Sequence, residues 1–305
     1  PRPCRRRRRP RRRPPTADLT GYPRRVRLAW ATDIHLDFLQ DDAVRRFAAA
    51  LAAAGADALI VSGDLSNAEQ LEHHLRLLSQ GVPGPLYFVL GNHDYYGSSI
   101  AAVRAAVEAL CGRRPRLRWL PAQGVVALTD RTALVGCDGW ADARLGAPER
   151  SPVVLNDFIH IEDLVAEVDP LARVRPSVLV GGDRRRLHAK LRQLGAAEAA
   201  ALRPVLTDAL ARFEHVLVVT HVPPFAETCW HAGRLSDDHW LPYFTCAAVG
   251  DVLRELAAAA PDRRLTVVCG HTHGEGEAEI LPNLRVLTGG AEYRHPALQR
   301  VLAVD

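Results

Sequence analysis

An apolar run stops at a glycine and three polar side chains in Leu86-Tyr87-Phe88-Val89-Leu90-Gly91-Asn92-His93-Asp94. Short apolar runs that stop at glycine or at a polar cluster are typical of strands in a sheet covered on both faces. An amide, an imidazole and a carboxylate are therefore expected together at the end of a buried strand. Active sites of α/β sheets are assembled at that edge.

Four other apolar runs in the chain stop in the same way. The polar motifs that follow them are Asp33-Ile34-His35, Gly63-Asp64, Thr220-His221 and Gly270-His271-Thr272-His273. Several strands are thus expected to bring carboxylate, amide and imidazole groups to the carboxyl edge of the sheet.

The spacing of the first three motifs predicts parallel strands. Asp33 and Asp64 are 31 positions apart and Asp64 and Asn92 are 28 apart, which suits strand–helix–strand units of about 30 residues. Between them, residues 43–54 are rich in alanine and arginine, and residues 69–78 place leucines on one helical face. The three motifs are therefore expected at the ends of three successive strands.

The side chains in these motifs are of the kinds that bind metal ions. Asp, Asn and His, without clustered cysteines, are ligands for hard to borderline divalent cations. A single residue of this kind is more often structural or a helix cap, but at least seven such groups at strand ends are not expected by accident. The motifs contain enough ligands for two ions.

In this order, the motifs D-x-H, G-D, G-N-H-D, T-H and G-H-T-H resemble the calcineurin-like metallophosphoesterase family over roughly residues 26–304. Their form is most similar to bacterial members that resemble cyclic-nucleotide phosphodiesterases. The G-N-H-D form differs from that of the Ser/Thr protein phosphatases. The resemblance implies a two-sheet α/β/β/α sandwich, and two strand runs near the C-terminus (residues 278–281 and 284–288) and a third (residues 298–301) are expected to extend its second sheet.

The resemblance also implies a role for each motif residue. The residues expected to bind the two ions are Asp33, His35 and His273 at the first ion, Asn92, His221 and His271 at the second, and Asp64 as a bridge between them. His93 would be the catalytic imidazole at the leaving oxygen, with Asp94 fixing its tautomer and orientation. Many relatives carry a second acid where this chain has Asn67, which is expected to cap a helix.

The implied activity is that of a dinuclear phosphoesterase. Two divalent ions, of which Mn, Fe or Zn suit these ligands, would activate a hydroxide and neutralise charge on the phosphate. A small-molecule phosphodiester is the favoured substrate, and a phosphomonoester or a nucleotide or lipid-sugar pyrophosphate is the alternative. A non-enzymatic interaction scaffold of the same fold would be expected to have lost ligands, whereas every ligand position is present here.

Aromatic and basic residues near the motifs could contact the substrate. The candidates are Tyr95, Tyr96, Trp140, Trp230 and Arg234. Loops that extend from strand ends carry specificity in such folds, and these rings suit stacking on a flat group. The alternative is that the aromatic residues only anchor long loops to the core. Residues 24–305 are expected to form one catalytic domain with a loop and helix insertion at about 138–194.

The N-terminal segment has a different composition. Residues 1–15 consist almost entirely of arginine and proline and hold nine arginines, without which the formal net charge of +4 becomes −5. Residues 1–23 are expected to be a disordered tail. Such a tail could bind nucleic acid or an anionic surface, but an extension without function is favoured.

Two absences guide the remaining expectations. No apolar stretch reaches 18 residues, so no membrane span is expected. The six cysteines lack paired short spacing, which argues against a disulfide framework. A cytoplasmic enzyme with a small phosphorylated substrate is expected, and the sequence leaves its oligomeric state open.

Overall fold

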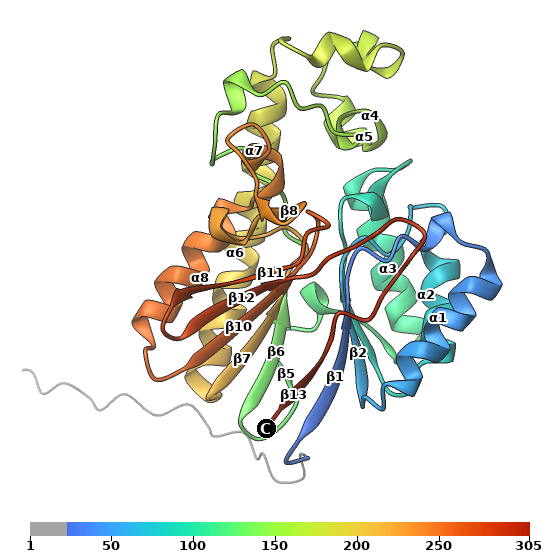
Figure 1. Ribbon diagram of the computed structural model, residues 1–305, viewed down its shortest axis with the longest axis vertical. Helices are drawn as coiled ribbons and strands as arrows, with labels where there is room; N and C mark the ends of the chain where they lie inside the picture. The colour runs from blue at the N-terminus through green and yellow to red at the C-terminus, as the bar shows by residue number, and fades with distance from the viewer. Residues whose placement is uncertain (1–22) are drawn as a thin grey trace, which may run out of the picture.

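Two sheets lie at the centre of the computed structural model, which describes residues 23–305 (Figure 1). The first sheet has the strand order β13 (Arg300–Val304), β1 (Val26–Ala31), β2 (Ala58–Ser62), β3 (Leu86–Val89) and β4 (Leu117–Trp119). The second has the order β11 (Gly276–Leu281), β12 (Leu284–Thr288), β10 (Arg264–Cys269), β7 (His215–Val219), β6 (Thr132–Gly136) and β5 (Val126–Ala127). A short hairpin joins β8 (Trp230–His231) to β9 (Arg234–Leu235).

Apolar strand residues form the layer between the two sheets. Leu28 and Ile60 of the first sheet and Leu217 and Val268 of the second belong to one buried cluster. Every residue of β2 and of β7 is buried, as expected of strands that are covered on both faces. Shortening a fully buried leucine to alanine in such a layer costs about 2–5 kcal/mol.

Helices cover the outer face of each sheet (Figure 1). Those beside the first sheet are α1 (Asp41–Ala53), α2 (Leu71–Gly81) and α3 (Ile100–Arg113), and those beside the second are α6 (Arg185–Arg212) and α8 (Ala247–Ala259). Val44, Phe47 and Leu51 of α1 recur every three or four residues and are buried, which places one helical face on the sheet. The α/β/β/α sandwich expected from the sequence is confirmed.

The parallel strands bring the polar motifs together. β1, β2 and β3 are parallel neighbours, and so are β7 and β10 in the second sheet. The motif residues follow these five strands, so they leave the sheets at the same edge. This confirms the expected placement of the first three motifs.

The C-terminal segment departs from the prediction. β11 and β12 join the second sheet as expected, but β13 pairs antiparallel with β1, with Val26 opposite Val304. After β12 the chain crosses from the second sheet to the first (Figure 1). Strand β13 thereby covers the edge of β1, which would otherwise present unpaired backbone groups.

Residues 138–184, which we call the cover segment, follow β6 and precede α6 along the chain. They lie beyond the edge of the two sheets (Figure 1). The segment holds two short helices, α4 (Asp157–His160) and α5 (Glu162–Val165). The insertion boundary expected at about residue 194 lies inside the longer helix α6, which begins at Arg185. A further short helix, α7 (Leu241–Phe244), precedes α8.

Short 3-10 turns complete the described chain. They are η1 (Leu36–Phe38), η2 (His93–Tyr95), η3 (Leu120–Ala122), η4 (Pro148–Arg150), η5 (Pro170–Arg173), η6 (Pro176–Leu179) and η7 (Ala226–Thr228). No helix within residues 23–305 is both long and apolar enough to cross a bilayer. The predicted tail lies outside the described residues except for its last position.

Candidate metal centre

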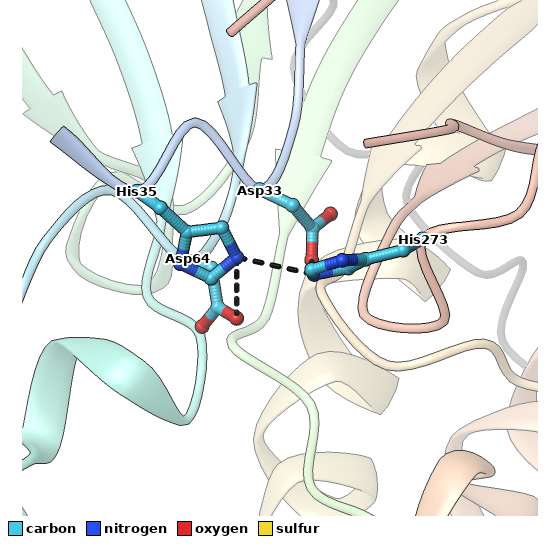
Figure 2. Close-up of side chains that lie close together, drawn as sticks. All are labelled: Asp33, His35, Asp64 and His273. Carbon is cyan, nitrogen blue, oxygen red and sulfur yellow. Dashed lines mark hydrogen bonds and ion pairs between the residues drawn. The ribbon is translucent and has the colours of Figure 1, made fainter. Parts of the chain in front are cut away.

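Four side chains from both sheets form the tighter part of the polar cluster (Figure 2). The ligand atoms of Asp33, His35, Asp64 and His273 all lie within 4.8 Å of one another. His35 Nε2 is 3.1 Å from His273 Nε2 and 3.8 Å from Asp64 Oδ2, and His273 Nε2 is 3.4 Å from Asp33 Oδ1. We call Asp33, His35 and His273 the first group.

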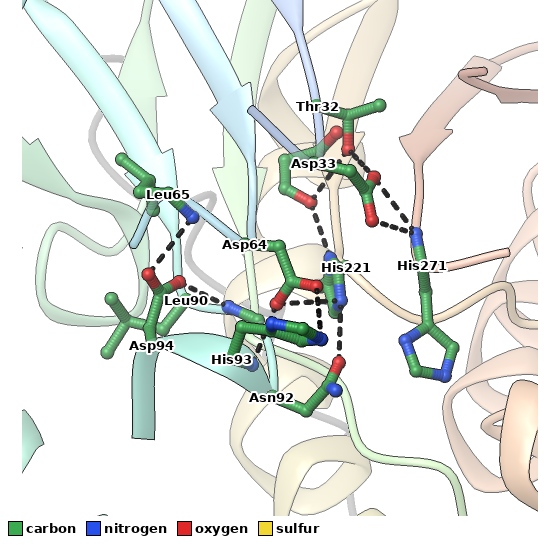
Figure 3. Close-up of polar contacts among 12 residues, drawn as sticks. Thr32, Asp33, Asp64, Leu65, Leu90, Asn92, His93, Asp94, His221 and His271 are labelled. Carbon is green, nitrogen blue, oxygen red and sulfur yellow. Dashed lines mark hydrogen bonds and ion pairs between the residues drawn. The ribbon is translucent and has the colours of Figure 1, made fainter. Parts of the chain in front are cut away.

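Asp64 also contacts a second set of side chains (Figure 3). His221 Nε2 is 3.3 Å from Asp64 Oδ1 and 3.0 Å from Asn92 Oδ1. Asp64 therefore turns one carboxylate oxygen toward His221 and the other toward His35, which is the geometry that a bridging ligand requires. We call Asn92, His221 and His271 the second group.

His271 lies at the edge of the second group. Its Nε2 is 3.0 Å from the carbonyl oxygen of Tyr243, and Figure 3 shows its ring turned aside from Asp64. A carbonyl only accepts, so Nε2 carries the proton and Nδ1 is the nitrogen left for an ion. The backbone N–H of His271 donates to both oxygens of Asp33, at 2.9 and 3.0 Å.

The contacts of His221 show that these atoms fit a cation. His221 Nδ1 is 2.9 Å from the carbonyl oxygen of Ser62, so the Nδ1 proton is donated there. Burial lowers the pKa of His221, so the ring is neutral and Nε2 has only a lone pair. That lone pair faces the Asn92 carbonyl oxygen and, when Asp64 is ionised, a carboxylate oxygen that has no hydrogen to donate either. Three acceptors at such distances repel each other unless a cation joins them.

The charges of the buried side chains also indicate that the cluster binds cations. Asp33 and Asp64 are each 1% exposed, and within residues 23–305 their ion-pair contacts are with histidines only. Burial raises the pKa of Asp64 well above its usual value, and the Asp33 carboxylate adds to this effect. Burial alone would also raise the pKa of Asp33, but its contacts with His273 and other histidines lower it. Burial lowers the pKa of His35 to about 3, so its imidazole is neutral and available as a ligand.

The backbone is strained at the same residues. The motif residues with left-handed backbone are Asp33 (φ 49°), His35 (φ 40°), Asp64 (φ 51°), His271 (φ 71°) and His273 (φ 57°). Only three other non-glycine residues of the described chain have positive φ. Sparsely populated backbone conformations cluster at functional sites, where surrounding contacts hold them in place.

Two motif glycines allow the carboxylates to approach closely. A Cβ at Gly91 would lie 2.1 Å from Asp64 Oδ1, and a Cβ at Gly270 would lie 2.0 Å from Asp33 Oδ2. No side chain fits in either place. This explains why glycine precedes the polar residues in both motifs.

The structure corrects the expected contact of Asp94. Its Oδ1 accepts hydrogen bonds from the backbone N–H groups of Leu65 and Ser66, and its Oδ2 accepts one from Gly91. Within the described chain it makes no hydrogen bond to the His93 ring. Asp94 therefore ties together the loops after β2 and β3 rather than orienting the imidazole.

His93 lies on the turn η2 directly beside Asp64. Its backbone N–H donates to Asp64 Oδ1 at 2.9 Å, and its Nε2 is 4.0 Å from Asp64 Oδ2. The ring stacks on Tyr96 with centroids 4.3 Å apart. Burial lowers the pKa of His93 to about 2. The ring is therefore neutral, with one N–H donor and one lone pair.

Two adjoining cavities open at these residues. The smaller has a volume of about 190 Å³ and is lined by Asp64, Asn92 and His273. The larger has a volume of about 880 Å³. His93, Tyr96 and Tyr293 line both, so these rings stand at the passage between the cavities.

Of the five residues predicted to contact the substrate, only Tyr96 lines the two cavities described above. Tyr95 is fully buried and donates to Asp138 at 2.9 Å. Trp140 lies in the core, and Trp230 lies on β8 against Gly276. Arg234 is exposed on β9.

Asn67, the expected helix cap, lies at the larger cavity. Its Oδ1 accepts a hydrogen bond from the backbone N–H of Gln70 at 3.0 Å. This side chain closes the turn before α2, but the N-cap position of that helix is Gln70, so Asn67 is not the expected helix cap.

Sequence reasoning missed two residues of the site. Asp157 of α4 accepts a hydrogen bond from Asn92 Nδ2 at 2.8 Å. The Tyr293 ring lies 4.5 Å from that of His35 and 4.9 Å from that of His273. Neither follows a strand motif: Asp157 looks like an acid in the first turn of a helix, and Tyr293 lies where the chain crosses between the sheets.

Comparisons with known proteins agree with this geometry. The family model described as calcineurin-like phosphoesterase matches residues 26–275. The fold is similar to that of the phosphopantetheinyl hydrolase of Mycobacterium tuberculosis, with 17% identity and a TM-score of 0.56 over 91% of this chain and 95% of that one. It is also similar to a dimetal phosphatase from Danio rerio, with 15% identity and a TM-score of 0.51 over 87% of each chain. None of the curated proteins matches this sequence significantly.

Proposed function

Since this chain belongs to the calcineurin-like phosphoesterase family, it is a dinuclear metal-dependent phosphoesterase, and we propose that it hydrolyses a small-molecule phosphodiester. The first group would hold one ion, the second group would hold the other, and Asp64 would bridge them. The convergence of lone pairs at His221, Asn92 and Asp64 supports this assignment. When bound, the ions supply Lewis acidity toward the phosphate and lower the pKa of a water molecule.

The charge of the smaller cavity is the observation that favours a diester. Its lining includes the carboxylates of Asp64 and Asp157 and contains no lysine or arginine. A phosphate monoester carries about −1.5 to −2 at pH 7, whereas a diester carries a single negative charge. Two divalent ions would bring a charge of about +4, and the carboxylates of Asp33, Asp64 and Asp157 would offset three of these charges. With no basic side chain in the lining to add positive charge, the cavity suits the singly charged ester better.

The position of His93 suggests which side the leaving group occupies. The ring stands between the smaller cavity and the larger one, and it is close to Asp64. We assign His93 the role of donating an N–H hydrogen bond to the leaving oxygen. The leaving alcohol would then extend into the larger cavity.

The larger cavity has the size and the walls for an organic group. Its volume of about 880 Å³ is within the range of small-molecule sites. Phe38 and Tyr293 are 45% and 44% exposed, and their rings lie in edge-to-face contact with centroids 5.2 Å apart. Such exposed rings provide apolar area for the alcohol of the substrate.

A pair of matched substrates tests the proposal. Bis(p-nitrophenyl) phosphate and p-nitrophenyl phosphate release the same alcohol but differ in charge. We expect kcat/KM to be at least about tenfold higher for the diester, equivalent to ~1.4 kcal/mol of transition-state binding. A higher value for the monoester would contradict the proposed substrate class without contradicting metal dependence.

The same assay tests the alternatives and the metal. Pyrophosphate and a phosphopantetheinyl ester belong in the panel, the latter because a protein of similar fold is named a phosphopantetheinyl hydrolase. Chelation should abolish hydrolysis. We propose Mn, Fe or Zn as the native metal, because imidazole and carboxylate ligands suit these ions, and adding Mn back should restore activity.

A further inference from the structure

We propose that Asp157, on helix α4 of the cover segment, is a positioning residue that holds the Asn92 amide with its oxygen directed at the second ion. This inference rests on the proposed assignment of Asn92 as a ligand of that ion. Asp157 follows none of the strand motifs, and it reaches the site only because the cover segment folds back over it.

The contacts of Asn92 define the orientation of its amide. Its Nδ2 donates to Asp157 Oδ1 at 2.8 Å. On the opposite side, its Oδ1 is 3.0 Å from His221 Nε2. Asn92 and Asp157 are only 8% and 7% exposed, so bulk water does not easily replace either partner.

A carboxylate beside the Asn92 amide can select one of the two orientations of that amide. An asparagine amide has nearly the same shape when its oxygen and nitrogen exchange places, so packing alone does not select one orientation. An ionised carboxylate only accepts hydrogen bonds and therefore attracts the NH₂ side. The amide nitrogen has no available lone pair for a metal, so the wrong orientation would remove a ligand.

The same carboxylate oxygen also holds a second side chain. Tyr96 donates its hydroxyl to Asp157 Oδ1 at 2.6 Å. The Tyr96 ring stacks on His93 with an interplanar angle of 27°. Asp157 therefore touches both the proposed ligand of the second ion and the ring that supports the proposed catalytic imidazole.

Backbone contacts keep Asp157 in place. The Gly97 N–H donates to the His160 carbonyl at 2.9 Å, and the Glu162 N–H donates to the Ser98 carbonyl at 3.1 Å. The Asp163 carboxylate accepts from the Ile100 N–H at 2.8 Å. These bonds attach α4 and α5 to the loop that follows His93.

Asp163 therefore provides a matched control. It is an acid of the same segment, six positions from Asp157, and it anchors the same loop without touching Asn92. Asp163→Ala removes one of these bonds but leaves the two backbone hydrogen bonds, so the segment should stay docked. Asp157→Ala removes the acceptor of the Asn92 amide in particular.

The test is a titration of the metal-free chain (residues 1–305) with Mn²⁺, in which free ions and spin-coupled pairs of ions are followed by electron paramagnetic resonance. The wild-type chain should bind two ions and show the coupled signal. Asp157→Ala should keep the first ion and bind the second about 10–100-fold more weakly, as is typical when a partner of a metal ligand is lost. Asp163→Ala should bind both ions like the wild type.

Asp157→Asn guards against a variant that fails to fold, because its side-chain carbonyl can still accept from Asn92. We expect it to bind the second ion more tightly than Asp157→Ala. Wild-type affinities at both sites in Asp157→Ala would overturn the inference, as would equal weakening in Asp163→Ala. A wild-type chain that fails to bind two ions would instead contradict the proposed ligand assignment on which the inference rests.

Discussion

The first group and the second group differ in what holds them in place. Loops at the strand ends fix the first group: the Asp33 N–H donates to the Gly63 carbonyl, the His35 N–H donates to the Asp64 carbonyl, and the His271 N–H clamps the Asp33 carboxylate. The second group also depends on segments outside the two sheets. The cover segment supplies Asp157 to Asn92, and α7 supplies the Tyr243 carbonyl to His271.

Because the two groups are held in place differently, we expect the two ions to bind with unequal affinity. A site built by the sheets alone is preorganised by the same contacts that hold the fold, whereas a site that needs a docked segment also needs that docking. We therefore expect the first ion to bind more tightly than the second. Single-residue variants in and around each group measure this difference in affinity.

The largest effect should come from Asp64→Asn, because Asp64 is the one residue that both groups share. The amide would offer one oxygen where the carboxylate offers two. We expect the variant to retain less than one ion per chain and to lose diester hydrolysis to the background rate. Elemental analysis together with the hydrolysis assay measures both. Two retained ions would show that Asp64 does not bridge.

The next pair of variants separates the groups. His35→Ala should lose the first ion, and since that ion shares Asp64 with the second, it should weaken the second as well. Asn92→Ala should lose only the second. Metal content after dialysis should therefore be near zero for His35→Ala and near one ion per chain for Asn92→Ala. Equal metal content in the two variants would remove the distinction between the groups.

A smaller effect is expected of His93→Ala, which belongs to neither group. The variant should keep both ions and lose about 10²–10⁴-fold in rate, the range typical of a positioned proton donor or acceptor. The loss should be larger for substrates with poor leaving groups, because these need more stabilisation of the leaving oxygen. If the variant loses its ions, His93 belongs with the ligands.

The smallest effect concerns a buried histidine outside both groups. His215 lies 2.9 Å from the Thr266 hydroxyl, and burial lowers its pKa to about 4. Below its unfolded pKa of 6.5, the unfolded chain binds a proton that the folded chain excludes. The stability that neutral His215 provides is therefore lost as the pH falls from 6.5 toward 4.

The slope of this loss can be measured. One such group changes the free energy of unfolding by about 1.4 kcal/mol per pH unit. In denaturant unfolding of the metal-free protein, His215→Gln should flatten the pH dependence by about that amount between pH 6 and 4.5. Equal slopes in the wild type and the variant would show that His215 is not excluded from protonation when folded.

Much of the architecture could be predicted because it depends on local patterns of apolar and polar residues in the sequence. Buried strands appear as short apolar runs, and parallel order follows from the spacing of Asp33, Asp64 and Asn92. Gly91 and Gly270 mark positions at which a carboxylate comes too close for a side chain. The candidate ligands follow from these motifs together with their resemblance to a known family.

The rest depends on contacts between distant segments, which no local pattern reports. Strand β13 pairs with β1, at the other end of the chain, and Asp157 lies 65 positions from the amide it contacts. Asp94 sits next to His93 in sequence, yet its carboxylate points to the backbone of Leu65 and Ser66. Neighbouring positions on a tight turn face different ways, so adjacency in sequence is a poor guide to contact.

The order in which the two groups fill can be measured by the hydrolysis of bis(p-nitrophenyl) phosphate, as Mn²⁺ is added to the metal-free chain in fractions of one equivalent. If the first group fills before the second and both ions are needed, the rate should stay near background up to about one ion per chain. It should then rise to a plateau at two. A plateau at one ion per chain would show that the second ion is not needed for hydrolysis, and a rate that chelation does not change would show that neither ion is needed.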